Sequence, residues 1–321
     1  MIIVALLEMT RHQKILISGA DGLVGSALST HLLDQGVAVH ALTRRKDKAQ
    51  SQDPSEAGKR YFHWDPARKQ LDAACLNGVT GIVHLAGESI GGGRWTARRK
   101  KVLLESRIDS IRLIFDALRL SPVPHQVHTV VSASATGIYQ PHPEHILVED
   151  SPVGNGFLAE VCQAWEQTIQ QGGAELGLRT VMLRSGVVWS REGGMYAQLA
   201  DMTRRFPAVI PGSGRQWMPW VHIQDAVRAY AMALYSDRME GPYNLVAPDS
   251  ITLGDFMHAL AENLEKKVWL PPVPAPFVRL GLGEMSSLLL DSMKVSPSRL
   301  MLAGFNFYYP TATEAFRDLQ N

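Results

Sequence analysis

One glycine-rich segment constrains the fold more than any other feature of the chain: Gly19-Ala20-Asp21-Gly22-Leu23-Val24-Gly25. The segment Lys14–Ser18, with three aliphatic residues at its centre, predicts a buried strand before it, and apolar residues at helical spacing follow it until Gly36. A strand, a glycine turn and a helix in this order are typical of the phosphate-binding part of a Rossmann βα unit. The glycines let the backbone approach a pyrophosphate, whose charge lies at the helix N-terminus. We therefore expect a dinucleotide here; a plain tight turn is the alternative.

Strands and helices alternate along the next two hundred residues, which predicts an α/β fold with a Rossmann-type, doubly wound parallel sheet. The predicted strands are 14–18, 37–43, 61–64, 81–85, 127–134, 179–189 and 243–247, and the predicted helices include 96–120, 157–171 and 221–236. The pattern changes after Trp189, and a helix (253–266) and a proline-rich strand (268–274) indicate a small C-terminal α+β domain. We assign residues 11–190 and 221–249 to the dinucleotide-binding domain. Residues 191–220 and 250–321 form a smaller substrate or lid domain, and residues 1–10 form an N-terminal extension.

Composition excludes several function classes. The 321 residues carry 32 basic and 31 acidic side chains, so we expect no binding of nucleic acid or of a membrane surface. No apolar run approaches the roughly 20 residues of a membrane span. Two cysteines, Cys75 and Cys162, make no disulfide framework, which favours a reducing, cytoplasmic location. No cluster of histidine, cysteine and carboxylate residues has metal-ligand spacing, so we expect no metal.

The end of the second predicted strand indicates which dinucleotide is bound. An acidic residue there accepts hydrogen bonds from the ribose hydroxyls of NAD, whereas an arginine pairs with the 2′-phosphate of NADP. This strand runs into Thr43-Arg44-Arg45 and has no Asp or Glu. The sequence therefore favours NADP(H) over NAD(H); solvated loop arginines are the alternative.

The spacing G-x-x-G-x-x-G resembles the extended short-chain dehydrogenase/reductase superfamily. His84-Leu85-Ala86-Gly87 is similar to its strand-4 motif, and Ser132–Tyr139 to the strand-5 segment that carries the active-site serine. More narrowly, Trp64-Asp65-Pro66, Arg94-Trp95-Thr96 and Trp220-Val221-His222 resemble an epimerase-like family that ends in a small C-terminal domain of unassigned function. This resemblance covers nearly the whole chain from Lys14.

The resemblance implies a set of cofactor contacts. They are Gly19, Asp21, Gly22, Leu23, Val24, Gly25, Thr43, Arg44, Trp64, Leu85, Ala86, Gly87, Glu88, Arg107, Ser132 and Val188. Trp64 would lie beside the adenine, with a core position as the alternative. Arg107, on the predicted helix after strand 4, is a cation that can reach a phosphate or ribose, with an exposed helix position as the alternative.

The usual catalytic pair of the superfamily, Y-x-x-x-K, is absent because no tyrosine has a lysine four residues later. Where the pair would sit, Phe157, Val161 and Trp165 form an apolar stripe. Ser134 keeps the place of the active-site serine, and Tyr139 is a second candidate catalytic residue. Further pocket candidates are aromatic or thioether side chains: Trp95, Met195, Trp217, Met218 and Trp220. We expect His222 to be a helix-entry residue rather than a catalyst.

Two functions are compatible with these residues. The first is an NADP(H)-binding, epimerase-like oxidoreductase that acts on a small molecule of unknown identity with a non-standard proton donor. The second is a non-catalytic regulatory or redox-sensing protein that holds NADP(H), as the cell-division labels of some family members suggest. The resemblance also implies a homodimer formed through the helices after strands 4 and 5.

Overall fold

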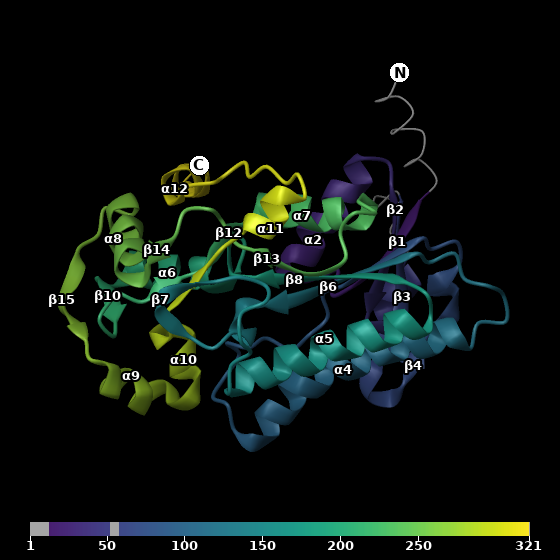
Figure 1. Cartoon of the computed structure of the whole chain (residues 1–321), viewed down its shortest axis with the longest axis horizontal. Coiled ribbons are helices and arrows are strands. Elements are labelled where there is room, and N and C mark those ends of the chain that lie inside the picture. The colour runs from purple at the N-terminus through teal and green to yellow at the C-terminus, as the bar shows by residue number, and fades with distance from the viewer. Residues whose placement is uncertain (1–12, 52–57, 321) are drawn as a thin grey trace.

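An eight-stranded sheet forms the centre of the computed structural model, which describes residues 13–51 and 58–320 (Figure 1). Its strand order is β13-β8-β6-β5-β1-β2-β3-β4, and all neighbours are parallel except β3 and β4. The strands are β1 (Lys14–Ser18), β2 (Ala38–Thr43), β3 (Lys59–Asp65), β4 (Gln70–Leu71), β5 (Gly81–His84), β6 (Thr129–Ala135), β8 (Arg179–Ser185) and β13 (Gly241–Leu245). The predicted doubly wound α/β fold is confirmed. The predicted N-terminal extension, residues 1–10, lies outside the described residues.

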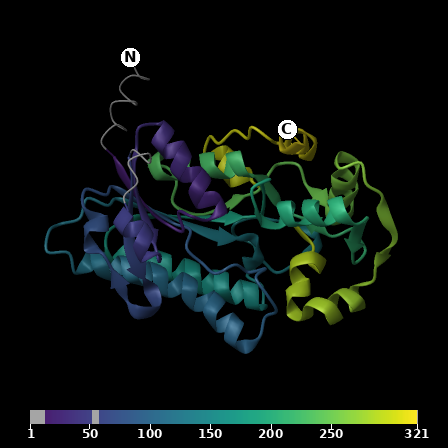
Figure 2. The ribbon, with the colours of Figure 1, turned by 180° about the vertical axis from the view of Figure 1, so that it is seen from behind.

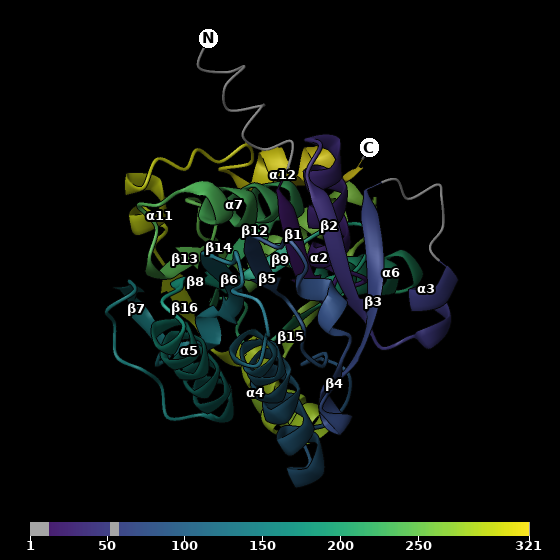
Figure 3. The same cartoon turned by 90° about the vertical axis from the view of Figure 1, so that its right-hand side faces the viewer.

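Helices cover both faces of this sheet (Figures 1 and 3). Helices α2 (Leu23–Asp34) and α7 (Ile223–Tyr235) pack together on one face. Helices α4 (Ala97–Arg119) and α5 (Phe157–Glu175) pack together on the other. A core of aliphatic side chains lies between the sheet and each helix pair. A short helix, α3 (Lys46–Ser51), follows β2.

The strand order reverses between β1 and β5, which are neighbours in the sheet although β2 and β3 come between them in the chain. Successive strands are added on one side of β1 before this point and on the other side after it. In open α/β sheets, ligands bind at such a switch point, outside the carboxyl ends of the strands. The glycine turn follows the carboxyl end of β1, so the topology places it there.

A smaller unit lies beside the carboxyl edge of the sheet (Figures 1 and 2). Its own core contains Trp189, Tyr196, Phe256 and Phe316. The helices there are α6 (Gly194–Arg205), α8 (Leu253–Asn263), α9 (Ala275–Leu282), α10 (Ser287–Leu290) and α12 (Ala312–Gln320). Helix α11 (Ser298–Leu302) packs against β13 of the main sheet instead. The short strands pair as β9 (Val187–Trp189) with β12 (Trp220–His222), β10 (Ala208–Pro211) with β15 (Val268–Val273), β11 (Trp217–Met218) with β14 (Ile251–Thr252), and β7 (His142–Leu147) with β16 (Met293–Val295).

The predicted strand 179–189 is interrupted at Gly186, which corrects the sequence prediction. A Cβ on Gly186 would lie 2.6 Å from the backbone carbonyl of Pro219, so another segment of chain passes too close for any side chain. Before Gly186, β8 belongs to the main sheet; after it, β9 pairs with β12 instead. The predicted helix 221–236 likewise begins only at Ile223, because Trp220–His222 form β12.

Candidate functional site

The glycine turn is fixed by contacts that leave no room for a Cβ. Gly19 has φ +75°, and a Cβ there would lie 2.8 Å from the carbonyl carbon of Leu85. A Cβ on Gly25 would lie 2.1 Å from the carbonyl oxygen of Gly19. Gly22 precedes the first helical residue and brings no side-chain cap. The backbone N–H groups in the first turn of α2 therefore stay available to an anion, as a pyrophosphate site requires.

A cavity of about 1040 Å³ extends from this turn to the C-terminal unit. Many of the predicted site residues line it: Gly19, Gly22, Leu23, Val24, Gly25, Leu85, Gly87, Arg107, Ser134, Tyr139 and Val188. Seven do not: Asp21, Thr43, Arg44, Trp64, Ala86, Glu88 and Ser132. The structure thus brings the turn and the ends of β5, β6 and β8 together around one space.

Arg107 is a buried cation that borders this cavity. Its side chain comes from α4, is 9% exposed, and donates to the carbonyl oxygens of Leu103 (2.8 Å) and Glu88 (3.2 Å). Within the described part of the chain, no carboxylate oxygen approaches its guanidinium to within 4.0 Å. Burial lowers the pKa of Arg107, because removal from water penalises the charged form. A cation held this way needs an anionic partner, and a pyrophosphate on the glycine turn fits that need.

Basic side chains gather at the end of β2, outside the cavity. Thr43 is buried, and its Oγ1 accepts a hydrogen bond from the backbone N–H of Arg45 at 3.2 Å. Arg44 is largely exposed, and its Nη1 lies 3.2 Å from Oε1 of Glu88. Lys48 of α3 forms a 2.7 Å ion pair with Asp21 of the glycine turn. These cations can reach a phosphate on the ribose of a bound dinucleotide.

Two of the predicted cofactor contacts are core residues. Trp64 is buried in the cluster that also contains Leu42 and Phe62, which favours the core alternative for this side chain. Ser132 is fully buried, and its Oγ donates to the carbonyl oxygen of Ala133 at 2.9 Å. Ala86 participates through its backbone, whose N–H donates to Oγ of Ser18 at 3.3 Å.

Ser134 belongs to a buried network of polar side chains. Its Oγ donates to Oε1 of Glu166 at 2.6 Å. The same carboxylate accepts two hydrogen bonds of 2.8 Å from the guanidinium of Arg184. This bidentate pairing raises the pKa of Arg184, although its burial acts in the opposite direction. The Ser134 hydroxyl therefore donates its proton to Glu166, and only its oxygen lone pairs remain available to other groups.

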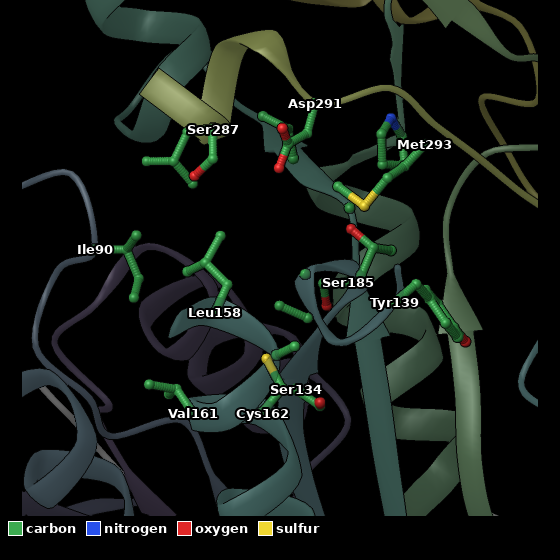
Figure 4. A pocket seen from close by; sticks show the side chains of 18 of the residues that line it. Ile90, Ser134, Tyr139, Leu158, Val161, Cys162, Ser185, Ser287, Asp291 and Met293 are labelled. Carbon is green, nitrogen blue, oxygen red and sulfur yellow. The ribbon is translucent and has the colours of Figure 1, made fainter. Parts of the chain in front are cut away.

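Tyr139 lies in the same network and points its hydroxyl away from the cavity (Figure 4). The hydroxyl donates to Oδ1 of Asn244 at 2.5 Å and accepts from Nη1 of Arg184 at 2.9 Å. The side chain is 2% exposed, and burial raises the pKa of Tyr139 to about 12. Because the hydroxyl has both a donor and an acceptor partner, this geometry favours a structural role over proton transfer to a ligand.

The far wall of the cavity comes from α5 and the C-terminal unit (Figure 4). Leu158 and Val161 project from α5, and Ser287, Asp291 and Met293 face them from the segment around α10 (Figure 4). Among the predicted pocket residues, Trp95, Trp217 and Met218 line this wall. Trp220 and Met195 do not line it and take the core position that is the alternative for such side chains: Trp220 stacks on Trp189 at 4.0 Å within the small core, and Met195 packs against that core.

His222 precedes α7, and its ring accepts a hydrogen bond from the backbone N–H of Gln224 at 3.3 Å. The predicted role as a helix-entry residue is confirmed. No group of three or more histidine, cysteine or carboxylate residues in 13–51 and 58–320 is arranged to hold a metal ion. Over the same residues, every helix is too short or too polar to cross a bilayer.

The chain matches the models of two known protein families. Residues 15–246, more than half of the chain, match the model of the NAD dependent epimerase/dehydratase family. The chain belongs to this family. Residues 273–319 match a second model, described as a domain of unknown function (DUF1731). The family predicted from the turn and strand motifs is therefore confirmed, including its C-terminal domain of unassigned function.

Relatives of this epimerase-family chain match along nearly its whole length. The Arabidopsis thaliana protein named "Epimerase family protein SDR39U1 homolog, chloroplastic" is 33% identical over 94% of this chain and 85% of its own. The Mycobacterium bovis epimerase family protein Mb2239 is 32% identical over 93% and 95%.

Solved structures show the same fold. Human epimerase family protein SDR39U1, crystallised with NADPH, superposes with a TM-score of 0.81 at 28% identity, covering 96% of this chain and 99% of that one. The nucleoside-diphosphate sugar epimerase from Corynebacterium glutamicum gives a TM-score of 0.74 at 28% identity, covering 99% of this chain and 61% of that one.

The site residues of this epimerase-family chain that escaped prediction include Lys48, Glu166 and Asp291. A basic residue one turn beyond the end of strand 2 is a usable sequence signal for Lys48. Glu166 lies on α5, in the segment where the Y-x-x-x-K pair would sit. Its partners Ser134 and Arg184 come from β6 and β8, so the sequence does not show that they meet. Asp291 lies in the C-terminal domain, far from every recognised motif, and no sequence pattern connects it with the cavity.

Proposed function

We propose that this chain binds NADPH and acts as an oxidoreductase on a small molecule in the cavity beyond the glycine turn. The observation that carries this proposal is the buried, carboxylate-free guanidinium of Arg107, which borders the same cavity as a turn in which Gly19 and Gly25 leave no room for a Cβ. Both features provide for a pyrophosphate at one end of a cavity of about 1040 Å³. The NADPH in the structure of human SDR39U1 supports the choice of dinucleotide.

The preference for NADPH over NADH depends on the basic group outside the cavity. β2 ends at Thr43 and is followed directly by Arg44 and Arg45 rather than by an acidic residue, and Lys48 comes from the adjoining α3. The carboxylates of Glu88, Asp47 and Asp21 already pair with these three cations. A ribose 2′-phosphate would thus meet cations whose positions are preset by ion pairs.

Bound NADPH would supply a hydride. The residues of the chain shape where a substrate accepts it: Leu158, Val161 and Met293 line the space with apolar side chains. We keep Ser134 and Tyr139 as the residues to test for catalysis. Carbonyl reduction also needs a proton, which would come from solvent at the open side of the cavity. As a donor to Glu166, Ser134 presents oxygen lone pairs and can accept a hydrogen bond from the hydroxyl of the product. Tyr139 would act through Arg184 by holding the network in place.

Two measurements test the proposal. Titrations of the purified protein with NADPH and NADH should show tighter binding of NADPH. With NADPH bound, the loss of its absorbance should then reveal turnover of members of a panel of carbonyl and enone compounds. Turnover should fall in Ser134→Ala and less in Tyr139→Phe. If the protein binds neither dinucleotide, the proposal is wrong.

A regulatory role without catalysis is the second candidate, and one observation favours it. The hydroxyls of Ser134 and Tyr139 are both engaged in the buried network, and the Y-x-x-x-K pair is absent. In that case NADPH would bind with no turnover, and a partner protein would be captured only in the presence of the cofactor. Turnover that is abolished by Ser134→Ala would exclude this candidate.

Two further assignments stay proposals: residence in the cytoplasm, and a homodimer formed through α4 and α5. The outward side chains of α5 include Gln163, Gln167, Gln170 and Gln171. A dimer formed through this face would have a polar interface. Size-exclusion chromatography with light scattering would show the mass of the dimer and its dissociation on dilution.

A further inference from the structure

We propose that the far part of the cavity, between α5 and the segment around α10, takes a mainly apolar molecule that is uncharged or cationic, and that it rejects phosphorylated ligands. This inference rests on the proposed function, because it concerns the substrate space of the same cavity. It separates this chain from a nucleotide-sugar enzyme, although the Corynebacterium glutamicum relative is named as one.

Apolar side chains dominate this part of the cavity. They converge from four stretches of chain: Ile90 and Trp95, α5, β11, and the segment from α10 to β16. The set is Ile90, Trp95, Phe157, Leu158, Val161, Trp217, Met218, Leu288, Leu289 and Met293. Trp95 and Phe157 stack edge-to-face with ring centroids 5.2 Å apart, so this wall is packed into a fixed shape. A surface like this binds flat or aliphatic groups by burying them.

The positive and negative side chains that line the cavity lie at opposite ends of it. Arg107 is the only lysine or arginine among the described residues that line it, and it lies beside Gly87 at the dinucleotide end. Two carboxylates, Glu284 and Asp291, line the far part. Glu284 forms an ion pair with Lys100. The carboxylate of Asp291 points into the cavity near Ser287, and no described cation lies within 4.0 Å of it (Figure 4).

Four cations lie near the far part without lining it. Lys100 is paired with Glu284, and Arg94 donates to the carbonyl oxygen of Leu280 at 3.2 Å. Lys294 lies 4.7 Å from the ring centre of Trp217. Arg279 acts on Asp291 at longer range, where it lowers the pKa of that carboxyl, but burial outweighs this effect and raises the pKa. None of the four is arranged as a bidentate clamp for a diphosphate.

These observations set the chemistry of the ligand. A diphosphate would lose its hydration against apolar side chains, find no cation on the wall and meet the carboxylate of Asp291. A hydroxyl, amide N–H or amine would instead donate to that carboxylate, while the rest of the molecule contacts the aromatic and aliphatic wall. Asp291 is thus the polar group that orients the ligand.

A matched set of probes tests this inference by isothermal titration calorimetry on the full chain, with and without saturating NADPH. The probes are 2-naphthol, 2-naphthyl phosphate and UDP-glucose, so that the first two differ only in the phosphate. We expect 2-naphthol to bind at least about 10-fold more tightly than 2-naphthyl phosphate. We expect UDP-glucose to show no binding at about 1 mM. In Asp291→Asn the ratio between the naphthyl probes should shrink at least about threefold, because the repulsive charge is removed.

The control is Asp201→Asn, which removes an exposed carboxylate of α6 that pairs with Arg204 and leaves the cavity unchanged. Equal or tighter binding of the phosphate, measurable binding of UDP-glucose, no binding of 2-naphthol, or an equal effect of both variants would each overturn the inference. A titration with NADPH alone tests the proposed function separately. The probe ratios are read with NADPH bound, because a phosphate probe could otherwise occupy the glycine turn of the cofactor-free protein.

Discussion

At the phosphate end of the cavity, a single carbon atom added to Gly25 would lie 2.1 Å from a backbone oxygen. At the far end, Leu288, Leu289 and Met293 border open space, and their side chains come from a domain that is separate in sequence. The first end is built from backbone, with one buried cation as its charged group. The second is built from side chains that tertiary packing brings together, with a carboxylate as its polar group.

This difference assigns cofactor binding to the phosphate end of the cavity and ligand selection to the far end. Backbone N–H groups and a helix terminus recognise a phosphate whatever molecule carries it, so that end is suited to a common cofactor. Side chains on short helices and loops vary without disturbing a sheet, so the far end is suited to a ligand specific to one relative. Substitutions at the first end should therefore be severe and affect the cofactor, whereas those at the second should be mild and affect the ligand.

Gly25→Ala should give the largest effect. The new Cβ meets the backbone of Gly19 and Ala20, which cannot move without displacing β1 from β5. We expect NADPH affinity to fall by about 100-fold or more and the free energy of unfolding to fall by about 2 kcal/mol. Fluorescence titration and urea denaturation measure the two quantities.

The matched control is Gly91→Ala, because a Cβ on Gly91 has no heavy atom within 4 Å. It should change neither quantity. If Gly25→Ala bound NADPH as the natural chain does, the phosphate end would be as tolerant as the far end, and the comparison would fail.

Arg107→Gln should come next, with a loss of about 30-fold in NADPH affinity. Its melting temperature without cofactor should stay close to that of the natural chain, because the substitution removes a buried cation that lacks a carboxylate partner. Arg112→Gln, on the exposed side of the same helix, should change neither value. A large drop in melting temperature with little change in affinity would show that Arg107 is a structural residue.

The same contrast explains how much the sequence could predict. The first strand, Lys14–Ser18, is predicted to the residue, because a short strand with three consecutive aliphatic residues followed by a glycine turn depends on local sequence. The break at Gly186 was missed, because its cause is the backbone of Pro219 in another segment. The wall of the cavity could be predicted only in part for the same reason.

The polar network shows this limit most clearly. Tyr139 was a reasonable proton donor by its place after strand 5, yet its hydroxyl partner Asn244 is 105 residues away in the chain. Ser134 lines the cavity, but its acceptor Glu166 lies on a helix whose sequence shows only an apolar stripe. Residue types and spacing identify which side chains are near the sheet edge. Only tertiary packing determines which acceptors their hydroxyl groups donate to.

The two ends should respond to acid with opposite signs. Burial lowers the pKa of His84, behind the phosphate end, to about 3, with a smaller contribution from Arg107. Below pH 6.5 the unfolded chain takes up a proton that the folded chain does not, so stability falls by about 1.4 kcal/mol per pH unit. At Asp291 burial raises the pKa above 3.8, so the folded chain keeps its proton longer and stability is lost as pH rises through that window.

Urea denaturation between about pH 4 and pH 7 checks both signs. His84→Gln should flatten the loss of stability below pH 6.5, and Asp291→Asn should remove the opposite contribution at the lower end of the range. The variants are compared with the natural chain because His31, His40 and His222 also have lowered pKa values. A steeper acid loss in His84→Gln would contradict the burial argument.

Arg44→Ala should give the smallest effect and sharpens the comparison most, because Arg44 lies outside the cavity. Its side chain is 73% exposed, so solvent and salt screen its charge, and we expect only about a 10-fold loss in NADPH affinity. NADH affinity should change little, since that dinucleotide lacks the 2′-phosphate. The NADPH loss should shrink as salt is raised, whereas the loss in Arg107→Gln should persist, because Arg107 is buried. The control is Arg60→Ala. Arg60 lies at the amino end of β3, and Arg44 follows the carboxyl end of the parallel strand β2. Equal losses for NADPH and NADH in Arg44→Ala would mean that the basic group does not read the 2′-phosphate, and that selection between the dinucleotides takes place within the cavity.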